Sequence, residues 1–557
     1  MSIADMPIEC VRGAQACALL DQAQFQAEWS ALHAACPWAT AFQGSAFIGA
    51  WYRIYREKFE PLLIISRAAN GELQGLLALA VSNQTGAMVV AGSHHAEYHA
   101  WISRPAHGNL FPRSAFRALR RSIPHAGLKF RYLPPHSPTA WLLQSGMKNI
   151  SILKAHPRPL LPFGNGAEIR KSLAKSGNKS RLRRLQKLGP VVFKRITDPE
   201  EFATHFDEII RCYDTRRLAV NGSAPFLNDP LKKAFHLEML RTPGLLHVTV
   251  LKVGEHIASA QLNTCGHKEI HLSLLAHHPF FAKHSPGKLH ILHLGKMLMD
   301  EGYERMDLTA GGDAYKERFA DAWDEVHTLS LFPSTFARET TGLRIGVEGA
   351  ARKALKHYSL TPMQAVSFAG KISRVDPVRW TGLAIRRGRD WLIPRREMRI
   401  YRFAMSEVNE ISTPDEFHRD SLDDLLAYHP AAALPSRHEF MSDALRRIEE
   451  DQHVYTRVEA GRLLHYGWLA ERPTDEMANS DFGGFPLPAN SALILDLLTL
   501  PTARRRGWAE RSLRIMLRDA REIPQTENVF IAIPTDSHAC QLVEKIGFKR
   551  EGSHACH

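Results

Sequence analysis

The chain has 557 residues, which predicts three or four domains at roughly 150 residues per domain. Hydrophobic residues make up 44% and charged residues 23%, a balance that excludes a disordered or collagen-like protein. No apolar run approaches the roughly 18 residues that span a bilayer, and the first twenty residues lack the apolar stretch of a signal peptide. The seven cysteines are odd in number and lack CxxC spacing, which argues against a disulfide framework or a zinc finger. We therefore expect a cytoplasmic protein without a metal site.

The net charge of +13 is concentrated in two segments. Arg170–Arg195 holds ten Lys/Arg and no acid, and Arg338–Arg402 holds fifteen Lys/Arg and five acids. Each contributes +10, so the remainder of the chain carries −7 of the total +13. Neither segment contains a helix-turn-helix pattern, an RNP-type aromatic motif or zinc-ligand spacing, so nucleic-acid binding is not expected.

The first basic segment contains Leu182, Leu185 and Leu188, whose spacing predicts a helix with one apolar edge. Its basic faces either hold phosphates, of a cofactor or of an anionic substrate, or form a solvated surface. Gly, Pro and Trp interrupt the second basic segment, and we interpret residues 336–397 as a basic interdomain linker.

In chain order, the pattern of residues 1–157 predicts a half-module with two helices and three strands. The helices are expected near Gln22–His33 and Ser45–Lys58, and the strands near Leu62–Arg67, Leu73–Ser82 and Ala87–Gly92. Residues 158–335 predict a second module with a hairpin, a third strand, a helix and a short strand. These elements are Leu245–Val253, Glu255–Asn263, Glu269–Leu275, Gly287–Asp300 and Arg305–Leu308.

Residues 398–557 predict a C-terminal domain of similar composition. The first half is expected to contain a strand (Met398–Ser406), two helices (Thr413–His429 and Ser436–Gln452) and a hairpin (His453–Ala470). The second half is expected to contain an apolar strand (Ala492–Leu500), a helix to about Ile523, a strand (Val529–Pro534), a helix (Ser537–Ile546) and a final strand from Phe548. Strand meanders with helices, repeated three times, predict the α+β class, with twisted, mostly antiparallel sheets flanked by helices.

The turn after the apolar strand combines arginines with small residues. Gly507 and Ala509 allow backbone N–H groups to approach a ligand, and a helix N-terminus adds partial positive charge. This turn resembles motif A of the GNAT acyl-CoA N-acyltransferases, Arg/Gln-x-x-Gly-x-Gly/Ala. Lys545-Ile-Gly547-Phe548 is similar to the ending of that fold. The resemblance implies a domain that binds acetyl-CoA through Leu498, Leu500, Arg504, Arg505, Arg506, Gly507, Trp508 and Ala509.

In that family a carboxylate or water takes the proton from the amine, and a tyrosine often protonates the thiolate. Asp496 is the best-placed base, although it could equally be a hydrogen-bonded strand residue. The position of the usual tyrosine holds Val543, and we interpret Cys540 as a packed thiol rather than an acid or nucleophile.

The second module contains Ser285-Pro286-Gly287-Lys288 at a helix start, followed by Asp307, Gly311 and Tyr315-Lys316. This order, behind a basic helix, resembles the CelD/BcsL-like acetyltransferases, a BioF-like and FemAB-related branch of the GNAT superfamily. The resemblance covers about residues 23–333 and implies tandem GNAT-like modules. It assigns Ser285, Gly287 and Lys288 to the donor or acceptor site and Tyr315 and Lys316 to catalysis. Without the resemblance, these residues would be interpreted as a loop and the start of a surface helix.

The leading hypothesis is an N-acyltransferase that moves acetyl from acetyl-CoA to an amine, with a polysaccharide or cell-envelope precursor as the acceptor implied by the resemblance. One alternative is a FemABX-like transferase that uses aminoacyl-tRNA on a cell-wall precursor. Another is a non-catalytic, CoA-binding scaffold in exopolysaccharide synthesis, which the missing tyrosine at Val543 would favour.

Overall fold

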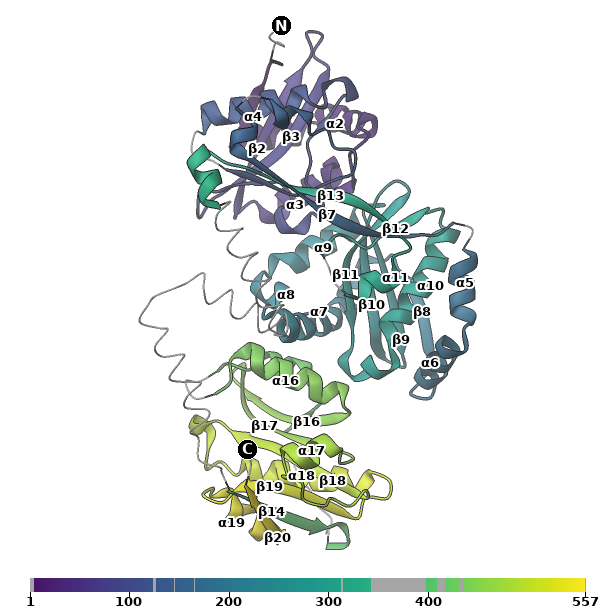
Figure 1. Ribbon diagram of the computed structural model, residues 1–557, viewed down its shortest axis with the longest axis vertical. Coiled ribbons are helices and arrows are strands. Elements are labelled where there is room, and N and C mark those ends of the chain that lie inside the picture. The colour runs from purple at the N-terminus through teal and green to yellow at the C-terminus, as the bar shows by residue number, and fades with distance from the viewer. Residues whose placement is uncertain are drawn as a thin grey trace. The chain divides into compact units, whose positions relative to one another are not determined.

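The computed structural model describes residues 5–123, 127–144, 146–164, 166–311, 314–341, 397–407, 416–430 and 434–555. Contacts divide these residues into two compact units (Figure 1). The first unit holds the described residues of 5–206, 229–276 and 286–341, and the second holds those of 207–228, 277–285 and 397–555. Most of the linker expected at 336–397 lies outside the described residues. No described helix is both long enough and apolar enough to cross a membrane.

The first sheet of unit 1 has four strands in sequence order and a fifth on β3. They are β1 (Glu9–Arg12), β2 (Phe59–Arg67), β3 (Leu73–Ser82), β4 (Met88–Val90) and β5 (Ile102–Ser103). Four helices pack on β2 and β3: α1 (Gly13–Leu20), α2 (Ala23–Ala35), α3 (Ser45–Tyr55) and α4 (Leu110–Ser122). Consecutive residues of β2 and β3 are buried, because both faces of this sheet are covered. The helices and strands predicted here are confirmed.

The second sheet has eight strands. Their spatial order is β6 (Leu128–Leu133), β13 (Ala322–Leu331), β7 (Ser151–Pro162), β12 (Arg305–Asp307), β11 (Glu269–His277), β10 (His256–Cys265), β9 (Leu246–Val253) and β8 (Val191–Ile196). A domain boundary at 157/158 would fall inside β7, which pairs with both β12 and β13. Residues 128–162 therefore share one sheet with the second module.

Within this sheet, β11 and β12 run parallel. Their register extends from Glu269 opposite Arg305 to His271 opposite Asp307. There β12 ends, whereas β11 continues to His277, so the two strands part at His271 and Asp307. From Leu272 onward, no strand in the described part of the chain pairs with the β12-facing edge of β11.

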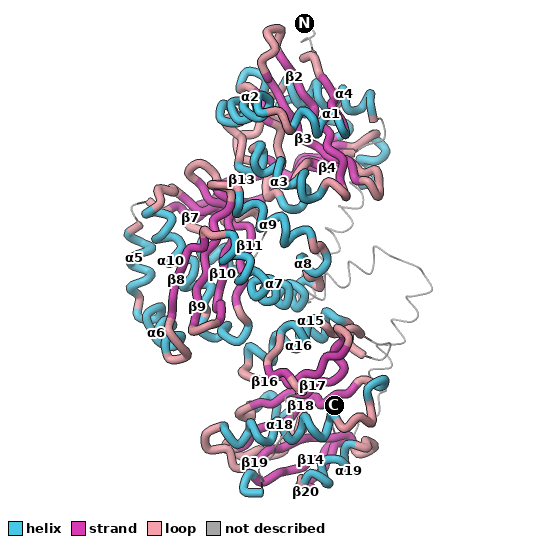
Figure 2. Tube along the Cα trace, turned by 180° about the vertical axis from the view of Figure 1, so that it is seen from behind, coloured by secondary structure: helices cyan, strands magenta, loops and turns pink. Residues whose placement is uncertain are grey.

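Helices cover this sheet as Figures 1 and 2 show. The helix α10 (Pro286–Asp300) packs on β9 and β10, and its Leu294 and Leu298 join a core with Leu272 and Met306. Two helices, α5 (Ala167–Ala174) and α6 (Ser176–Gln186), pack against α10, so the single helix predicted for the first basic segment is divided in two by the extended backbone of Lys175. The helices α9 (Leu231–Arg241) and α11 (Ala314–Phe319) also belong to unit 1, whereas α7 (Pro199–Asn221) begins in unit 1 and continues into unit 2, which also holds α8 (Pro225–Asn228).

The third sheet lies in unit 2 and has seven strands. Their order is β15 (His418–Arg419), β16 (Gln452–Glu459), β17 (Arg462–Ala470), β18 (Ser491–Thr499), β19 (Asn528–Pro534), β14 (Glu397–Ala404) and β20 (Lys549–Ala555). β18 and β19 run parallel only from Ser491/Asn528 to Ile494/Ile531 and then part. Each large sheet thus contains one diverging parallel pair, and the α+β class is confirmed.

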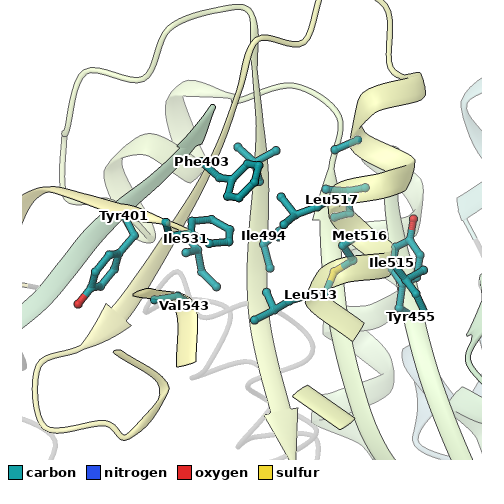
Figure 3. Close-up of a cluster of buried hydrophobic side chains, with 14 of the residues drawn as sticks. Tyr401, Phe403, Tyr455, Ile494, Leu513, Ile515, Met516, Leu517, Ile531 and Val543 are labelled. Carbon is teal, nitrogen blue, oxygen red and sulfur yellow. The ribbon is translucent and has the colours of Figure 1, made fainter. Parts of the chain in front are cut away.

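The core of this sheet lies under α18 (Trp508–Glu522) and α19 (Ala539–Ile546), as Figure 3 shows. Leu513 and Met516 of α18 face Ile494, while Val543 of α19 lies near Ile531. The strand predicted at Ala492–Leu500 is central, and its first five residues, 491–495, are buried.

Two helix predictions of this domain have different outcomes. The helix expected to start at Ser436 is confirmed as α16 (Arg437–Glu449), because Ser436 and Glu439 form a reciprocal capping box. The helix expected at Thr413–His429 is wrong in extent: in its described part, only α15 (Leu422–Leu426) is helical and His418–Arg419 is a strand. Asp420, with φ +59°, interrupts helical geometry between them.

Candidate functional site

The parting of β18 and β19 is accompanied by a bulge in β18. Tyr466 of β17 pairs with Leu498 and Trp468 pairs with Leu495, so Asp496 and Leu497 together face Gly467. Asp496 adopts φ +45°, which is rare for a residue with a side chain and typical of such bulges. Beyond Ile494, no strand of the described chain pairs with the β19-facing edge of β18. Backbone N–H and C=O groups on this edge are therefore available to an extended ligand.

The Asp496 carboxylate accepts a hydrogen bond from Arg447 of α16. The Arg447 guanidinium also donates to Asp443 over 2.7 Å and to Gln452 over 3.0 Å, which fixes its position. The Asp496 side chain is half-buried, with 53% of its surface exposed. This desolvation, with help from Asp443, outweighs the attraction of Arg447 and raises the pKa of Asp496 above its ordinary value. The expected base is thus accessible and has a raised proton affinity.

The turn after β18 leads directly into α18. Arg505 and Gly507 have φ +67° and +76°, and Gly507 is the N-cap of α18 without a side-chain cap. A Cβ on Gly507 would meet only the Arg511 guanidinium, at 3.8 Å, so the surface above the glycine is open. Uncapped N–H groups at the start of a helix, next to an open glycine, suit a phosphate oxygen.

The arginine side chains of this turn differ in whether they already pair with other groups of the protein. Arg506 pairs with Glu459 over 2.8 Å and stacks on the buried Trp508. Arg504 makes a long bond of 3.4 Å to the Thr499 carbonyl, whereas exposed Arg505 has no ion pair among the described residues. The other expected cofactor residues are the buried Leu500, the half-buried Leu498 and the half-buried Ala509, which can offer backbone groups.

Position 543 supplies no acid, because the Val543 side chain has no ionisable proton; it is a fully buried residue of α19. The nearby Tyr401 of β14 donates to Glu544 over 2.8 Å, and its ring points away from Ile494 in Figure 3. Burial and hydrogen bonds with Cys540 and Glu544 raise the pKa of Tyr401 to about 12. Cys540 is 5% exposed, consistent with a packed thiol. Neither side chain is a candidate acid.

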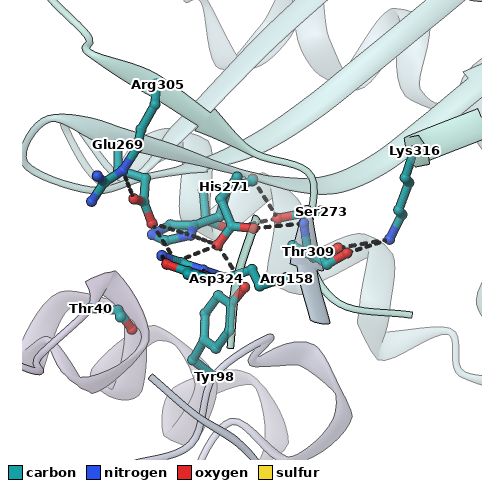
Figure 4. A network of polar contacts seen from close by, with 12 residues as sticks. Thr40, Tyr98, Arg158, Glu269, His271, Ser273, Arg305, Thr309, Lys316 and Asp324 are labelled. Atoms are coloured by element: carbon teal, nitrogen blue, oxygen red, sulfur yellow. Dashed lines mark hydrogen bonds and ion pairs between the residues drawn. The ribbon is translucent and has the colours of Figure 1, made fainter. Parts of the chain in front are cut away.

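A second polar site lies where β11 and β12 part (Figure 4). Asp307, the last residue of β12, accepts hydrogen bonds from Tyr98 over 2.6 Å and from Arg158 over 3.1 Å. His271 lies 3.1 Å from the same carboxylate oxygen, and the Thr309 N–H donates to the other oxygen over 2.7 Å. Segments far apart in the sequence therefore converge on one carboxylate.

Arg158 neutralises this buried group. It is 4% exposed and bonds Asp307, Glu269 and Asp324 at 2.6–3.1 Å. Burial would raise the pKa of Asp307, but His271 and Arg158 outweigh it and hold this pKa below its ordinary value. Burial and the ionised Asp307 raise the pKa of Tyr98 well above its ordinary value, so its phenol stays protonated.

Lys316 and Glu97 lie beside this network. The Lys316 ammonium is buried and donates to the carbonyl and hydroxyl of Thr309, both over 3.0 Å. Glu97, whose side chain is 15% exposed, pairs with Arg131 over 3.4 Å. Burial raises the pKa of Glu97 above its ordinary value, although Arg131 and Lys316 oppose the shift. A carboxyl with raised proton affinity thus lies within the electrostatic reach of Lys316.

The other residues expected at the site of this module lie at the start of α10 and in α11. Gly287 lies in the first turn of α10, Lys288 is exposed, and Ser285 precedes the helix with φ +52°. Tyr315 is in α11, but its side chain lies outside the described residues. Lys316 adjoins the Asp307 network through Thr309, whose N–H donates to Asp307.

Sequence reasoning did not assign Tyr98, Arg158 or His271 to a site, because each is separated from Asp307 by 36 to 209 residues. Arg158 could have indicated this site from the sequence, because it is a charged residue in the otherwise apolar end of a strand, residues 157–162. A buried arginine implies a buried carboxylate partner.

Two groups of described side chains have ligand atoms close enough for a metal ion: Glu269, His271 and Asp307, and His94, His95 and Asp229. Arg158 and Arg305 already occupy the carboxylates of the first group. In the second group, Lys58 donates to Asp229 and Tyr55 bridges Asp229 and His95. In both groups the carboxylates thus already pair with protein cations or hydrogen-bond donors.

Comparison with known proteins identifies the module that contains the Asp307 network. Residues 174–317 match the acetyltransferase (GNAT) domain family. The match spans about a quarter of the chain, includes Lys288 and Lys316, and confirms the GNAT resemblance of this module. No curated protein matches the chain.

Similar solved structures share little sequence with this chain. FemX is 10% identical, with 54% of this chain and 95% of that chain covered and a TM-score of 0.39. L-PGS from Bacillus licheniformis is 11% identical, with 60% and 94% covered and a TM-score of 0.35. A tandem GNAT protein from the clavulanic acid biosynthesis pathway is 11% identical, with 65% and 96% covered and a TM-score of 0.20.

Proposed function

We propose that this protein is an acyl-CoA-dependent N-acyltransferase that transfers acetyl from acetyl-CoA to an amine. The observation that carries the proposal is the unpaired edge of β18, which leads from the Asp496 bulge to the uncapped start of α18. A CoA thioester needs such a site: backbone groups along an extended arm, and N–H groups for its pyrophosphate. The GNAT match of residues 174–317 supports acyl transfer by the chain as a whole.

In this proposal the pantetheine arm lies along β18 beyond Ile494, and its pyrophosphate meets the N–H groups around Gly507 with Arg505 beside them. Backbone N–H groups of β18 stabilise the oxyanion that forms on the thioester carbonyl. Asp496 takes the proton of the attacking amine, for which its exposure and raised pKa are suited. The thiolate leaves and is protonated by solvent, because Val543 has no proton to give.

The Asp307 network supports a second candidate site in the middle module. We propose that Glu97 serves as its base and that the Lys316 ammonium stabilises developing negative charge, since both lie beside the point where β11 and β12 part. Ser285, Gly287 and Lys288 would accompany the donor at the start of α10, and Tyr315 would adjoin Lys316. An amine on a polysaccharide or cell-envelope precursor is the proposed acceptor class.

The test is transfer of radiolabelled acetyl from acetyl-CoA to a panel of amino sugars and lipid-linked amines. Asp496→Asn and Lys316→Met report on the two sites separately, and Asp443→Asn is the control for Asp496 because it also contacts Arg447. Product from wild type that Asp496→Asn alone abolishes would support the C-terminal site. Transfer only from aminoacyl-tRNA would favour the FemABX-like alternative, and binding of acetyl-CoA without any product would favour a scaffold.

A further inference from the structure

The helix α6 carries a cationic face that neither proposed site uses. Lys179, Arg183 and Lys187 follow one another at four-residue spacing, and Arg184 lies beside them. All four are exposed, whereas Asn178 and Leu185, on the opposite side of the helix, are buried. The helix therefore packs through one edge and presents a continuous row of positive charge on the other.

This cationic face has no counter-charge within the described protein. Lys179, Arg183, Arg184 and Lys187 form no ion pair with a described carboxylate, and the only acid on α5 is Glu168, 3.5 Å from Lys171. At the end of the same basic segment the situation is different. Lys194 and Arg195 each pair with a glutamate over 2.7 Å. Like charges at four-residue spacing repel, and an anionic partner would remove that repulsion.

One exposed aliphatic side chain adjoins the cationic face: Leu188, which follows α6 directly, is 56% exposed. The segment from Ala167 to Val192 contains no aromatic residue on which a nucleic-acid base could stack. Cations beside an exposed leucine fit a membrane leaflet, which is anionic at its surface and apolar beneath, better than they fit RNA.

We propose that the cationic face of α6, with Leu188, docks the protein on an anionic membrane surface. Lysine and arginine side chains contact the lipid phosphates, and the leucine side chain enters the acyl boundary. The chain outside the two basic segments has a net charge of −7, so that part adds no net attraction to such a surface. This inference is independent of which module transfers an acyl group.

The test is co-sedimentation of the full chain with vesicles of phosphatidylcholine alone or with about 30% phosphatidylglycerol. Wild type should sediment only with the anionic vesicles and should dissociate in about 0.5 M salt. The variant Lys179→Glu/Arg183→Glu/Lys187→Glu should lower the partition constant at least about 100-fold. Leu188→Ala should weaken binding while leaving its salt dependence in place.

The matched control is Arg121→Glu/Lys148→Glu/Lys154→Glu, which changes the net charge equally on exposed residues elsewhere in unit 1. It should sediment as wild type does. An equal loss in the control would overturn the proposal, because only net charge would then matter. Failure of wild type to sediment would overturn it as well. So would an α6 variant that binds vesicles normally but loses affinity for bulk tRNA or acetyl-CoA, since the face would then serve a nucleic acid or the cofactor.

Discussion

The cation of Arg158 should be the strongest single electrostatic contribution to the middle module. Its guanidinium is 4% exposed and serves Asp307, Glu269 and Asp324, of which Asp307 is fully buried. Arg158→Met keeps most of the side-chain volume but leaves Asp307 without its cation. Breaking a buried pair by removing one partner costs about 3–5 kcal/mol, so we expect a loss of that size in the free energy of unfolding.

The assay is hydrogen–deuterium exchange of peptides from β11 and β12 in increasing urea, which reports on this module alone. Arg305→Met is the control, because Arg305 also pairs with Glu269 but is 48% exposed and should cost at most about 1 kcal/mol. Arg158→Met/Asp307→Asn, which removes both charges, should recover part of the loss. Equal, small effects of Arg158→Met and Arg305→Met would refute the reasoning, because the network would then stabilise nothing.

The pH dependence of the same variants follows from the lowered pKa of Asp307. A carboxyl whose folded pKa lies below its unfolded value stabilises the fold above that unfolded value, about 3.9, and loses this contribution as pH falls. The difference between wild type and Arg158→Met should therefore be largest near neutral pH and shrink in acid.

Three further predictions concern the C-terminal domain. Asp496→Asn should lower kcat by about 10²–10⁴-fold with the KM for acetyl-CoA unchanged, and an unchanged kcat would exclude Asp496 as the base. Val543→Tyr should not restore an acid but should destabilise the domain by about 1–3 kcal/mol in urea titration, because position 543 is fully buried. Burial would lower the pKa of His453, but Asp420 and Glu471 raise it. This pairing should contribute fully to the free energy of unfolding below about pH 6.5, and its contribution should decline as pH rises through the folded pKa of His453. A difference in the free energy of unfolding between wild type and His453→Gln that does not change with pH would contradict this.

The sequence predicted elements well where burial and local chemistry agree. The run Ala492–Leu495 predicted a central strand because a strand covered on both faces is apolar throughout, and β18 is such a strand. Ser436 predicted a helix start because serine is a favoured N-cap residue, and the structure adds its reciprocal capping box with Glu439. The extent of α15 was mispredicted because the left-handed backbone at Asp420 is not evident from its residue type.

Those parts of the candidate sites whose residues are neighbours in the sequence could be predicted. The open glycine and its arginines adjoin one another between 504 and 509, so their pattern was visible. The Asp307 network was not, since Tyr98, Arg158 and His271 come from separate elements that only the fold brings together. The bulge at Asp496 likewise depends on the register of β17 against β18, which no local pattern sets.

The most direct test of acyl-CoA use is isothermal titration with acetyl-CoA of wild type, Gly507→Glu, Gly461→Glu and Lys288→Ala. Gly461 has φ +71°, nothing within 4 Å of an added Cβ, and a place in the β16–β17 turn, so it matches Gly507 in strain and openness. We predict saturable binding by wild type and Gly461→Glu, with a loss in Gly507→Glu because its carboxylate would repel the pyrophosphate. Loss in Lys288→Ala instead would place the donor in the middle module. Absence of binding by wild type would contradict acyl-CoA-dependent transfer by this protein.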